Sequence, residues 1–117
     1  MTAEPIYHIC KHAEWKAAEN TGYYAGSLQD KSDGFIHFSG WDQVVESAAK
    51  HRAGQDGLVI LKVDREKLGD SLKWETSRGG NLFPHLYGQL PFTAVIRQAD
   101  LPLGDDGRHI FPADWNP

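Results

Sequence analysis

Residues 34–39 read Gly34-Phe35-Ile36-His37-Phe38-Ser39 and run directly into a helical pattern that ends near Gly54. The apolar residues of that pattern recur at i, i+3, i+4, i+7 and i+8, which predicts one buried helix face. They are Trp41, Val44, Val45, Ala48 and Ala49. Alternation along the strand places Phe35, His37 and Ser39 on one face and Ile36 and Phe38 on the other. We therefore expect a buried strand that carries an imidazole and turns straight into a helix.

Ser39 is expected to begin this helix as its N-cap, with Asp42 as its partner in a capping box. Free backbone N–H groups at a helix N-terminus attract anions. The stretch therefore predicts a site for an anion or a sugar–phosphate, and Ser39 is a candidate ligand-binding residue besides its structural role.

Length, charge and cysteine content exclude several classes of protein. A chain of 117 residues is expected to form a single domain over 1–117. A formal net charge of −4, with both signs mixed along the chain, makes duplex nucleic acid a poor partner. The single cysteine, Cys10, favours a reducing compartment, the first residues lack a signal-peptide pattern, and no apolar run could cross a bilayer. We expect a cytoplasmic protein with no membrane partner.

The remaining patterns predict mostly strands. Strands are expected at 6–10, 58–64, 72–76, 83–88 and 93–97, a second helix at 11–20, and a polar loop at 25–34. Pro84 lacks a backbone N–H, so its segment is expected to avoid a central ladder position on that side. Residues from 100 onward are irregular and rich in proline and glycine. The chain therefore predicts an α+β fold with a mixed, mainly antiparallel sheet and two helices.

Three histidines lie in apolar or aromatic settings: His8, His37 and His85. An imidazole in such a setting needs a partner or loses its charged form. Each one, taken alone, is explained by a core histidine bonded to a backbone carbonyl. Three in one small domain favour a shared site, in which His37 and His85 are candidate catalytic residues.

Glu75 is the carboxylate that suits proton chemistry, because it follows Trp74 at the end of an expected strand. It could act as a general base or orient a ribose hydroxyl. The alternative is a salt bridge at the rim with Lys73 or Arg78.

Tyrosines add a second kind of candidate, since they can stack on a ring and donate a hydroxyl hydrogen bond. They also need no explanation beyond core packing. The candidates are Tyr23, Tyr24 and Tyr87.

Metal binding has suitable donors in the three histidines and Glu75, but the chain has no HExxH helix and no close ligand pair. We expect no metal. Cys10 is expected to be a small buried hydrophobe.

Four motifs resemble an uncharacterised bacterial and plant family, domain of unknown function 952, over nearly the whole chain. They are Tyr7-His8-Ile9, residues 34–39 with Gln43, Lys73-Trp74-Glu75, and Phe83-Pro84-His85-Leu86-Tyr87-Gly88. That family resembles a compact ADP-ribosyltransferase-like fold, with distant similarity to RNA 2′-phosphotransferases. The stretches that carry this second resemblance are His37-Phe38-Ser39, Ala48-Ala49, Arg52-Ala53-Gly54 and Val59 through Val63-Asp64.

The resemblance implies NAD or a related nucleotide as ligand. By it, His8 would hold the ribose and His37 would lie on the nicotinamide side. Glu75 is a candidate by its chemistry alone.

Three hypotheses follow. The first is an enzyme that binds NAD, ADP-ribose or a related nucleotide in a cleft lined by histidine and tyrosine, and that acts as a glycosyl or ADP-ribosyl transferase. Its catalytic residues would be Glu75, His85 and His37, and its binding residues His8, His37, Ser39, Tyr23 and Tyr87. The second is a non-catalytic module that binds a small molecule or protein with the same pocket. The third is a structural or interaction domain whose histidines only pack.

Overall fold

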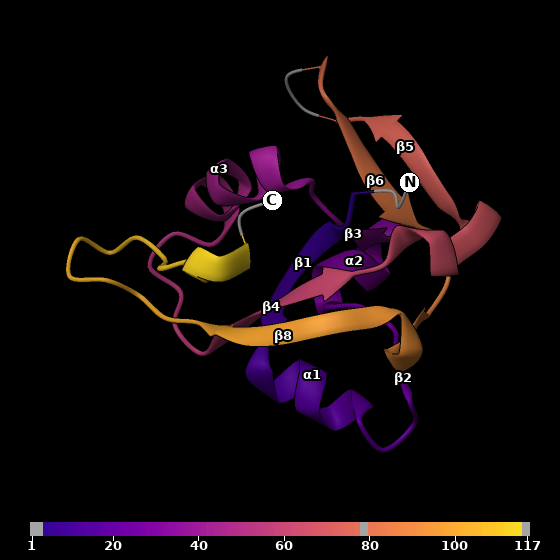
Figure 1. The fold of residues 1–117 in the computed structure, drawn as a ribbon, viewed down its shortest axis with the longest axis horizontal. Helices are drawn as coiled ribbons and strands as arrows, with labels where there is room; N and C mark the ends of the chain where they lie inside the picture. Colours follow the sequence, from indigo (N-terminus) through magenta and orange to yellow (C-terminus); the bar gives the residue numbers. More distant parts are fainter. Residues whose placement is uncertain (1–3, 78–79, 116–117) are drawn as a thin grey trace.

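Strand β4 (Leu58–Val63) is the centre of a three-stranded antiparallel sheet in the computed structural model, which describes residues 4–77 and 80–115. It pairs with β1 (Ile6–Lys11) on one side and β8 (Val95–Leu101) on the other. Five of its six residues are buried, as its nearly continuous apolar run predicts for a strand covered on both faces. Figure 1 shows this sheet crossing the middle of the molecule.

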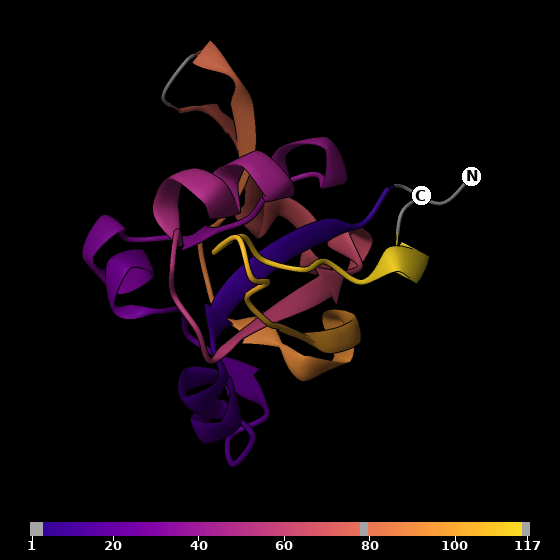
Figure 2. The ribbon, with the colours of Figure 1, turned by 90° about the vertical axis from the view of Figure 1, so that its left-hand side faces the viewer.

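Each face of this sheet has its own apolar cluster. On one face, Trp15 of α1 (His12–Ala18) packs with Tyr24, Leu61 and Leu90. On the other, Val44 of α3 (Trp41–His51) packs with Tyr7, Ile60 and Trp115. The two helices accordingly lie on opposite sides of the strands (Figures 1 and 2).

A second three-stranded sheet has the order β3-β6-β5, with β3 at Ile36–His37, β6 at Leu82–Leu86 and β5 at Leu72–Thr76. The 3₁₀ segment η1 (Arg65–Ser71) leads into β5. Backbone hydrogen bonds of 2.8 Å in both directions between Tyr7 and Ser39 join β1 to the end of β3. A short pair, β2 (Tyr23–Tyr24) with β7 (Leu90–Pro91), completes the strands described. The paired ends of β5 and β6 project from the body (Figure 1).

The expected α+β class is confirmed, and every strand pairing among the described residues is antiparallel. The expected number of helices is wrong, because the stretch expected as a polar loop holds α2 (Leu28–Asp33). Ser27 caps α2, and Asp30 returns a hydrogen bond to the Ser27 backbone N–H. The polar composition concealed a capping box of the Ser-x-x-Asp type.

Helix α3 begins one residue later than expected. Gly40, not Ser39, is its N-cap, and Gln43, not Asp42, answers by accepting the Gly40 N–H at 3.0 Å. The Ser39 backbone is already engaged by Tyr7, which holds it in the sheet. The buried stripe of α3 is also narrower than expected, since Val45 is 51% exposed.

The expectation for the N–H side of Pro84 is confirmed, and the expected start of the last strand is corrected. Pro84 lies in β6, the middle strand, paired with Trp74. Its carbonyl accepts the Phe38 N–H just beyond β3, so the missing Pro84 N–H falls where β3 has ended. Residues 92–94 form a 3₁₀ turn, η3 (Phe92–Ala94), and β8 starts only at Val95. Residues 77–81 join β5 to β6, and residues 78 and 79 lie outside the described part of the chain.

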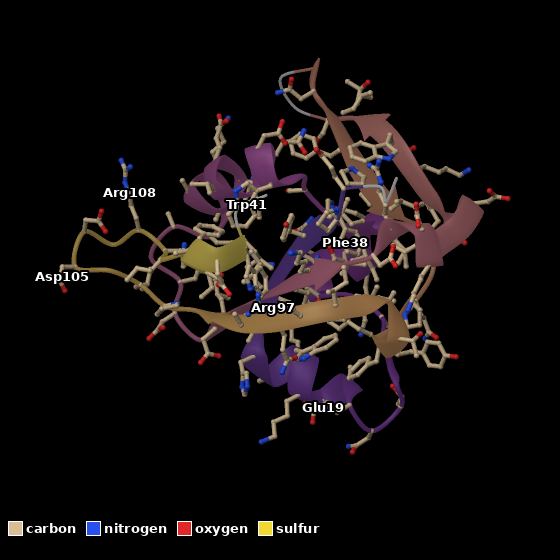
Figure 3. All side chains as sticks on the ribbon, in the orientation of Figure 1. Glu19, Phe38, Trp41, Arg97, Asp105 and Arg108 are labelled. Carbon is tan, nitrogen blue, oxygen red and sulfur yellow. The ribbon has the colours of Figure 1, made fainter. Side chains whose placement is uncertain are left out.

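The segment after β8 leaves the body as a loop and then returns to it (Figure 1). Leu103 and His109 form an isolated bridge, and Asp105 and Arg108 lie on the exposed loop between them (Figure 3). The segment ends in η4 (Ala113–Trp115), whose Trp115 side chain is buried. An ion pair between Arg97 and Asp114 at 3.0 Å fastens it to β8. None of the described helices is long and apolar enough to cross a membrane.

Candidate functional site

Strand pairing in the β3-β6-β5 sheet gathers three of the sequence motifs on one face. His37 of β3 lies directly opposite His85 of β6, and Glu75 of β5 lies opposite Phe83, two residues before His85. Because side chains alternate along a strand, Phe35, His37, Glu75, His85 and Tyr87 all point to this side. We call these five residues the ring face.

Phe35 is the centre of the ring face. Its ring stacks on that of His85 with centroids 4.1 Å apart, and lies 4.6 Å from the ring of His37 and 5.3 Å from that of Tyr87. The rings of His37 and His85 meet edge to face at 5.6 Å. Such contacts orient each ring through its neighbours. Two imidazoles are thereby held side by side.

Glu75 links the β5 and β6 sides of the ring face. Its Oε1 accepts from the Tyr87 hydroxyl at 2.6 Å and lies 2.9 Å from Nδ1 of His85. The Tyr87 hydroxyl first, and the His85 ring second, lower the pKa of Glu75. The same hydrogen bond to the carboxylate raises the pKa of Tyr87. Glu75 is thus an ionised, half-exposed acceptor that could hold a ligand hydroxyl.

His37 has a carboxylate at each ring nitrogen. Nδ1 lies 2.5 Å from Oδ1 of Asp30, and Nε2 lies 3.0 Å from Oδ2 of Asp33. The His37 side chain is 39% exposed, so the ring can be reached from solvent. A carboxylate-oriented imidazole at the surface suits general acid–base work.

Asp30 lies beneath the ring face with its side chain 4% exposed. Burial acts to raise its pKa, but hydrogen bonds from His37 and Ser27 outweigh burial and lower the pKa to about 2. Gly26 makes room for it, because a Cβ there would come within 2.7 Å of the Asp30 Cβ at a backbone φ of +99°. The first turn of α2 is therefore built around the ionised carboxylate of Asp30.

His8 lies below Asp30 rather than on the ring face, and it is 3% exposed. Its Nδ1 is 2.5 Å from the His37 carbonyl oxygen, which can only accept, so Nδ1 carries the proton. Its Nε2 then accepts from the Tyr24 hydroxyl at 2.9 Å. Burial lowers the pKa of His8. Both ring nitrogens of His8 therefore already have protein partners. Direct contact between His8 and a ligand stays a prediction.

The other expected binding residues lie outside the ring face. Ser39 is buried and bridges to Tyr7 through its backbone. Tyr23 is 51% exposed on β2, opposite Pro91, and no ring contact recorded among the described residues joins it to the ring face. Their expected ligand contacts remain predictions.

Sequence reasoning missed Asp30, Asp33 and Phe35. The loop expected at 25–34 includes Asp30 and Asp33, although Ser27 followed three residues later by Asp30 is a helix-start pattern. A helix through Asp33 turns both carboxylates toward the strand that follows. Phe35 shares the strand face of His37 by simple alternation and could have been singled out on that ground.

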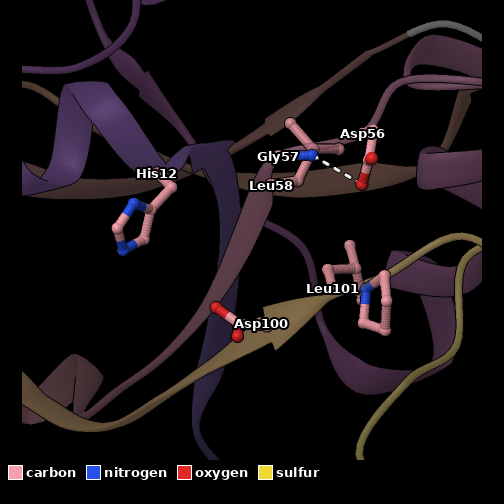
Figure 4. Close-up of a pocket in the computed structure, with 7 residues that line it drawn as sticks. His12, Asp56, Gly57, Leu58, Asp100 and Leu101 are labelled. Carbon is pink, nitrogen blue, oxygen red and sulfur yellow. Dashed lines mark hydrogen bonds between the residues drawn. The ribbon is translucent and has the colours of Figure 1, made fainter.

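A pocket of about 400 Å³ lies elsewhere, where α1 and β4 begin and β8 ends (Figure 4). His12, Asp56 and Asp100 supply its polar groups, and Leu58 and Leu101 its apolar wall. It shares no residue with the ring face. No group of three or more His, Cys, Asp or Glu side chains within 4–77 and 80–115 is placed to hold a metal ion together.

Comparisons with known proteins point to one group of relatives. The model of a family described as "Protein of unknown function (DUF952)" matches residues 9–98. The crystal structure of protein CC0527 from Caulobacter crescentus is 51% identical, covers 91% of this chain and 93% of that chain, and has a TM-score of 0.86. The solution NMR structure of CC0527 is 52% identical, with coverages of 89% and 90% and a TM-score of 0.80. No curated protein matches the chain.

Proposed function

We propose, for a chain that belongs to the DUF952 family of proteins of unknown function, that the ring face binds NAD, ADP-ribose or a related nucleotide. The observation that carries this proposal is the shared acceptor Glu75, bound by His85 and Tyr87 beside the ring of Phe35. A ribose presents adjacent hydroxyls that a carboxylate can accept, and a base presents a flat ring that aromatic side chains can stack against.

The exposure of the ring face supports this assignment. Tyr87 is an exposed large aromatic residue, and His37 and Glu75 are half-exposed. Phe35 is partly buried and His85 is buried. A ligand would therefore meet polar groups that are already oriented, which reduces the ordering cost of binding.

A transfer reaction at this face would use Glu75 and His37. The Glu75 carboxylate would stabilise positive charge that develops on a ribose carbon as its bond to the base breaks, and His37 would move a proton. Electrostatic stabilisation of this kind requires an ionised Glu75, which its lowered pKa supplies.

The second candidate is a binding module without turnover. One observation favours it: Oε1 of Glu75 already accepts hydrogen bonds from two protein groups, which compete with a reacting centre. In this case the same ligand would bind and leave unchanged.

Calorimetry with NAD, ADP-ribose and AMP tests the proposal. We expect binding to the wild type and at least tenfold weaker binding to Glu75→Gln. Glu46→Gln is the matched control, because Glu46 lies on α3 in an exposed pair with Lys50. Absence of heat with every nucleotide at millimolar concentration would contradict the proposal.

Chromatography of NAD after incubation with the protein separates the two candidates. Release of nicotinamide by the wild type, lost in Glu75→Gln, indicates a transferase or glycohydrolase. Binding with NAD recovered intact indicates the module.

A further inference from the structure

Asp30 is the most heavily engaged side chain near the ring face. Its Oδ2 accepts the Ser27 N–H at 2.8 Å, and its Oδ1 accepts the His37 N–H at 3.2 Å and lies 2.5 Å from Nδ1 of the same residue. Nε2 of His8 is 3.6 Å from Oδ2. One buried carboxylate therefore contacts both the backbone N–H and the ring of His37.

The two carboxylates at His37 differ in how firmly they are held. Asp30 is buried and has further partners in α2 and β3. Asp33 has a side chain 35% exposed at the end of α2, four residues before His37. The nitrogen facing Asp30 has a permanent partner, while the nitrogen facing Asp33 opens toward solvent and can exchange its partner.

We infer that Asp30 is a positioning residue that keeps the proton of His37 on Nδ1 and thereby presents Nε2 to the ligand. The ligand then takes the place of Asp33 at Nε2. The inference rests on the proposed function, since it names the atom of the ring face that meets the nucleotide. Because a carboxylate oxygen only accepts, Nδ1 next to it donates and Nε2 is the nitrogen whose proton can leave.

His8 secures the opposite side of the same residue. Its Nδ1–H donates to the His37 carbonyl, while the Tyr24 hydroxyl fixes its ring from behind. The other groups that face the His37 ring are Asp33, Phe35 and the ring of His85. Of all these, Asp30 is the one buried acceptor at a His37 ring nitrogen in the described part of the chain. Asp30 therefore determines which nitrogen of the His37 ring carries the proton.

Long-range ¹H–¹⁵N correlation spectra of the His37 ring test the inference in the wild type, without a ligand. We expect the neutral ring, reached as the pH is raised, to keep its proton on Nδ1 and lose the one on Nε2. A neutral ring with its proton on Nε2 would overturn the inference.

Two isosteric variants on the same helix sharpen the test. Asp33→Asn is expected to keep the Nδ1–H tautomer, and Asp30→Asn to lose it. Backbone amide spectra show whether Asp30→Asn has folded, and the wild-type result decides if it has not. Retention of the Nδ1–H tautomer in folded Asp30→Asn would also overturn the inference.

Titration with ADP-ribose tests the ligand-facing part. In folded Asp30→Asn we expect at least tenfold weaker binding, and in the wild type a shift of the His37 Nε2 resonance on binding. Equal binding by the two proteins, or an unmoved Nε2 resonance, would overturn this part. Absence of binding to the wild type would overturn the proposed function and this part with it, whereas the tautomer is decided by the ligand-free spectra.

Discussion

His8 fits the first of the two alternatives that the sequence offers, a core histidine bonded to a backbone carbonyl. It is buried and bonded to the backbone of His37, while its part in a shared site stays a prediction. The Ser27-x-x-Asp30 pattern could have placed Asp30, the neighbour of His8, at a helix start, but a sequence does not show which polar side chain turns inward. The residue types of the site could be predicted, but the burial of each side chain could not.

The Tyr24 hydroxyl provides a test of this buried network. Tyr24→Phe removes the donor to His8 Nε2 and leaves a buried acceptor unpaired, at a cost of about 1–3 kcal/mol in the free energy of unfolding. The neighbouring Tyr23→Phe, at an exposed position, should change it by less than about 0.5 kcal/mol. Urea denaturation measures both, and equal effects would contradict the network.

Acid should destabilise the protein in two steps. Burial lowers the pKa of His8 below its ordinary 6.5, so the unfolded state takes up its proton first, and stability is lost as the pH falls below about 6.5. The pKa of Asp30 lies at about 2 against an ordinary 3.8, so its contribution is present above about pH 4 and lost as the pH falls toward 2.

Denaturation at a series of pH values measures these steps. The fall that begins near pH 6.5 should be absent in His8→Asn and retained in His12→Asn, whose histidine is exposed. A first step that persists in His8→Asn would assign it to another group.

Among the elements, β5 and β6 followed their patterns most closely. Period-two alternation is enough to bring His85 and Tyr87 toward Glu75, and the strand at 72–76 was placed correctly. Pro84 lies in the middle strand because β3 ends after two residues, so no ladder residue on that side needs the N–H that proline lacks. Where a short strand stops depends on its neighbour, which local patterns cannot show.

The link between these two strands can be tested through Tyr87. Its pKa is raised because the phenolate would lose its hydrogen bond to Glu75 and be repelled by it. Glu75→Gln removes that charge, so the pKa of Tyr87 should fall, while Glu46→Gln on α3 should leave it unchanged. A pH titration of the Tyr87 ring by NMR decides, and an unaltered pKa in Glu75→Gln would contradict the link.

At the scale of the whole molecule, the sheets are joined by contacts far apart in sequence. The Tyr7–Ser39 bridge brings β1 and β3 together, and His8 and His37 meet because of it. The sequence predicted the α+β class, but not the burial of His8 away from the ring face, nor the pocket at His12 and Asp100. A pocket forms where neighbouring helices and strands leave space between them, and no local sequence pattern encodes that space.

Mapping of backbone amide shifts during titration with ADP-ribose tests most directly whether the ring face is the ligand site. The account predicts that the perturbed amides cluster at residues 33–39, 73–75 and 83–87. Perturbations centred on His12, Asp56 and Asp100, or none at millimolar ligand, would contradict it.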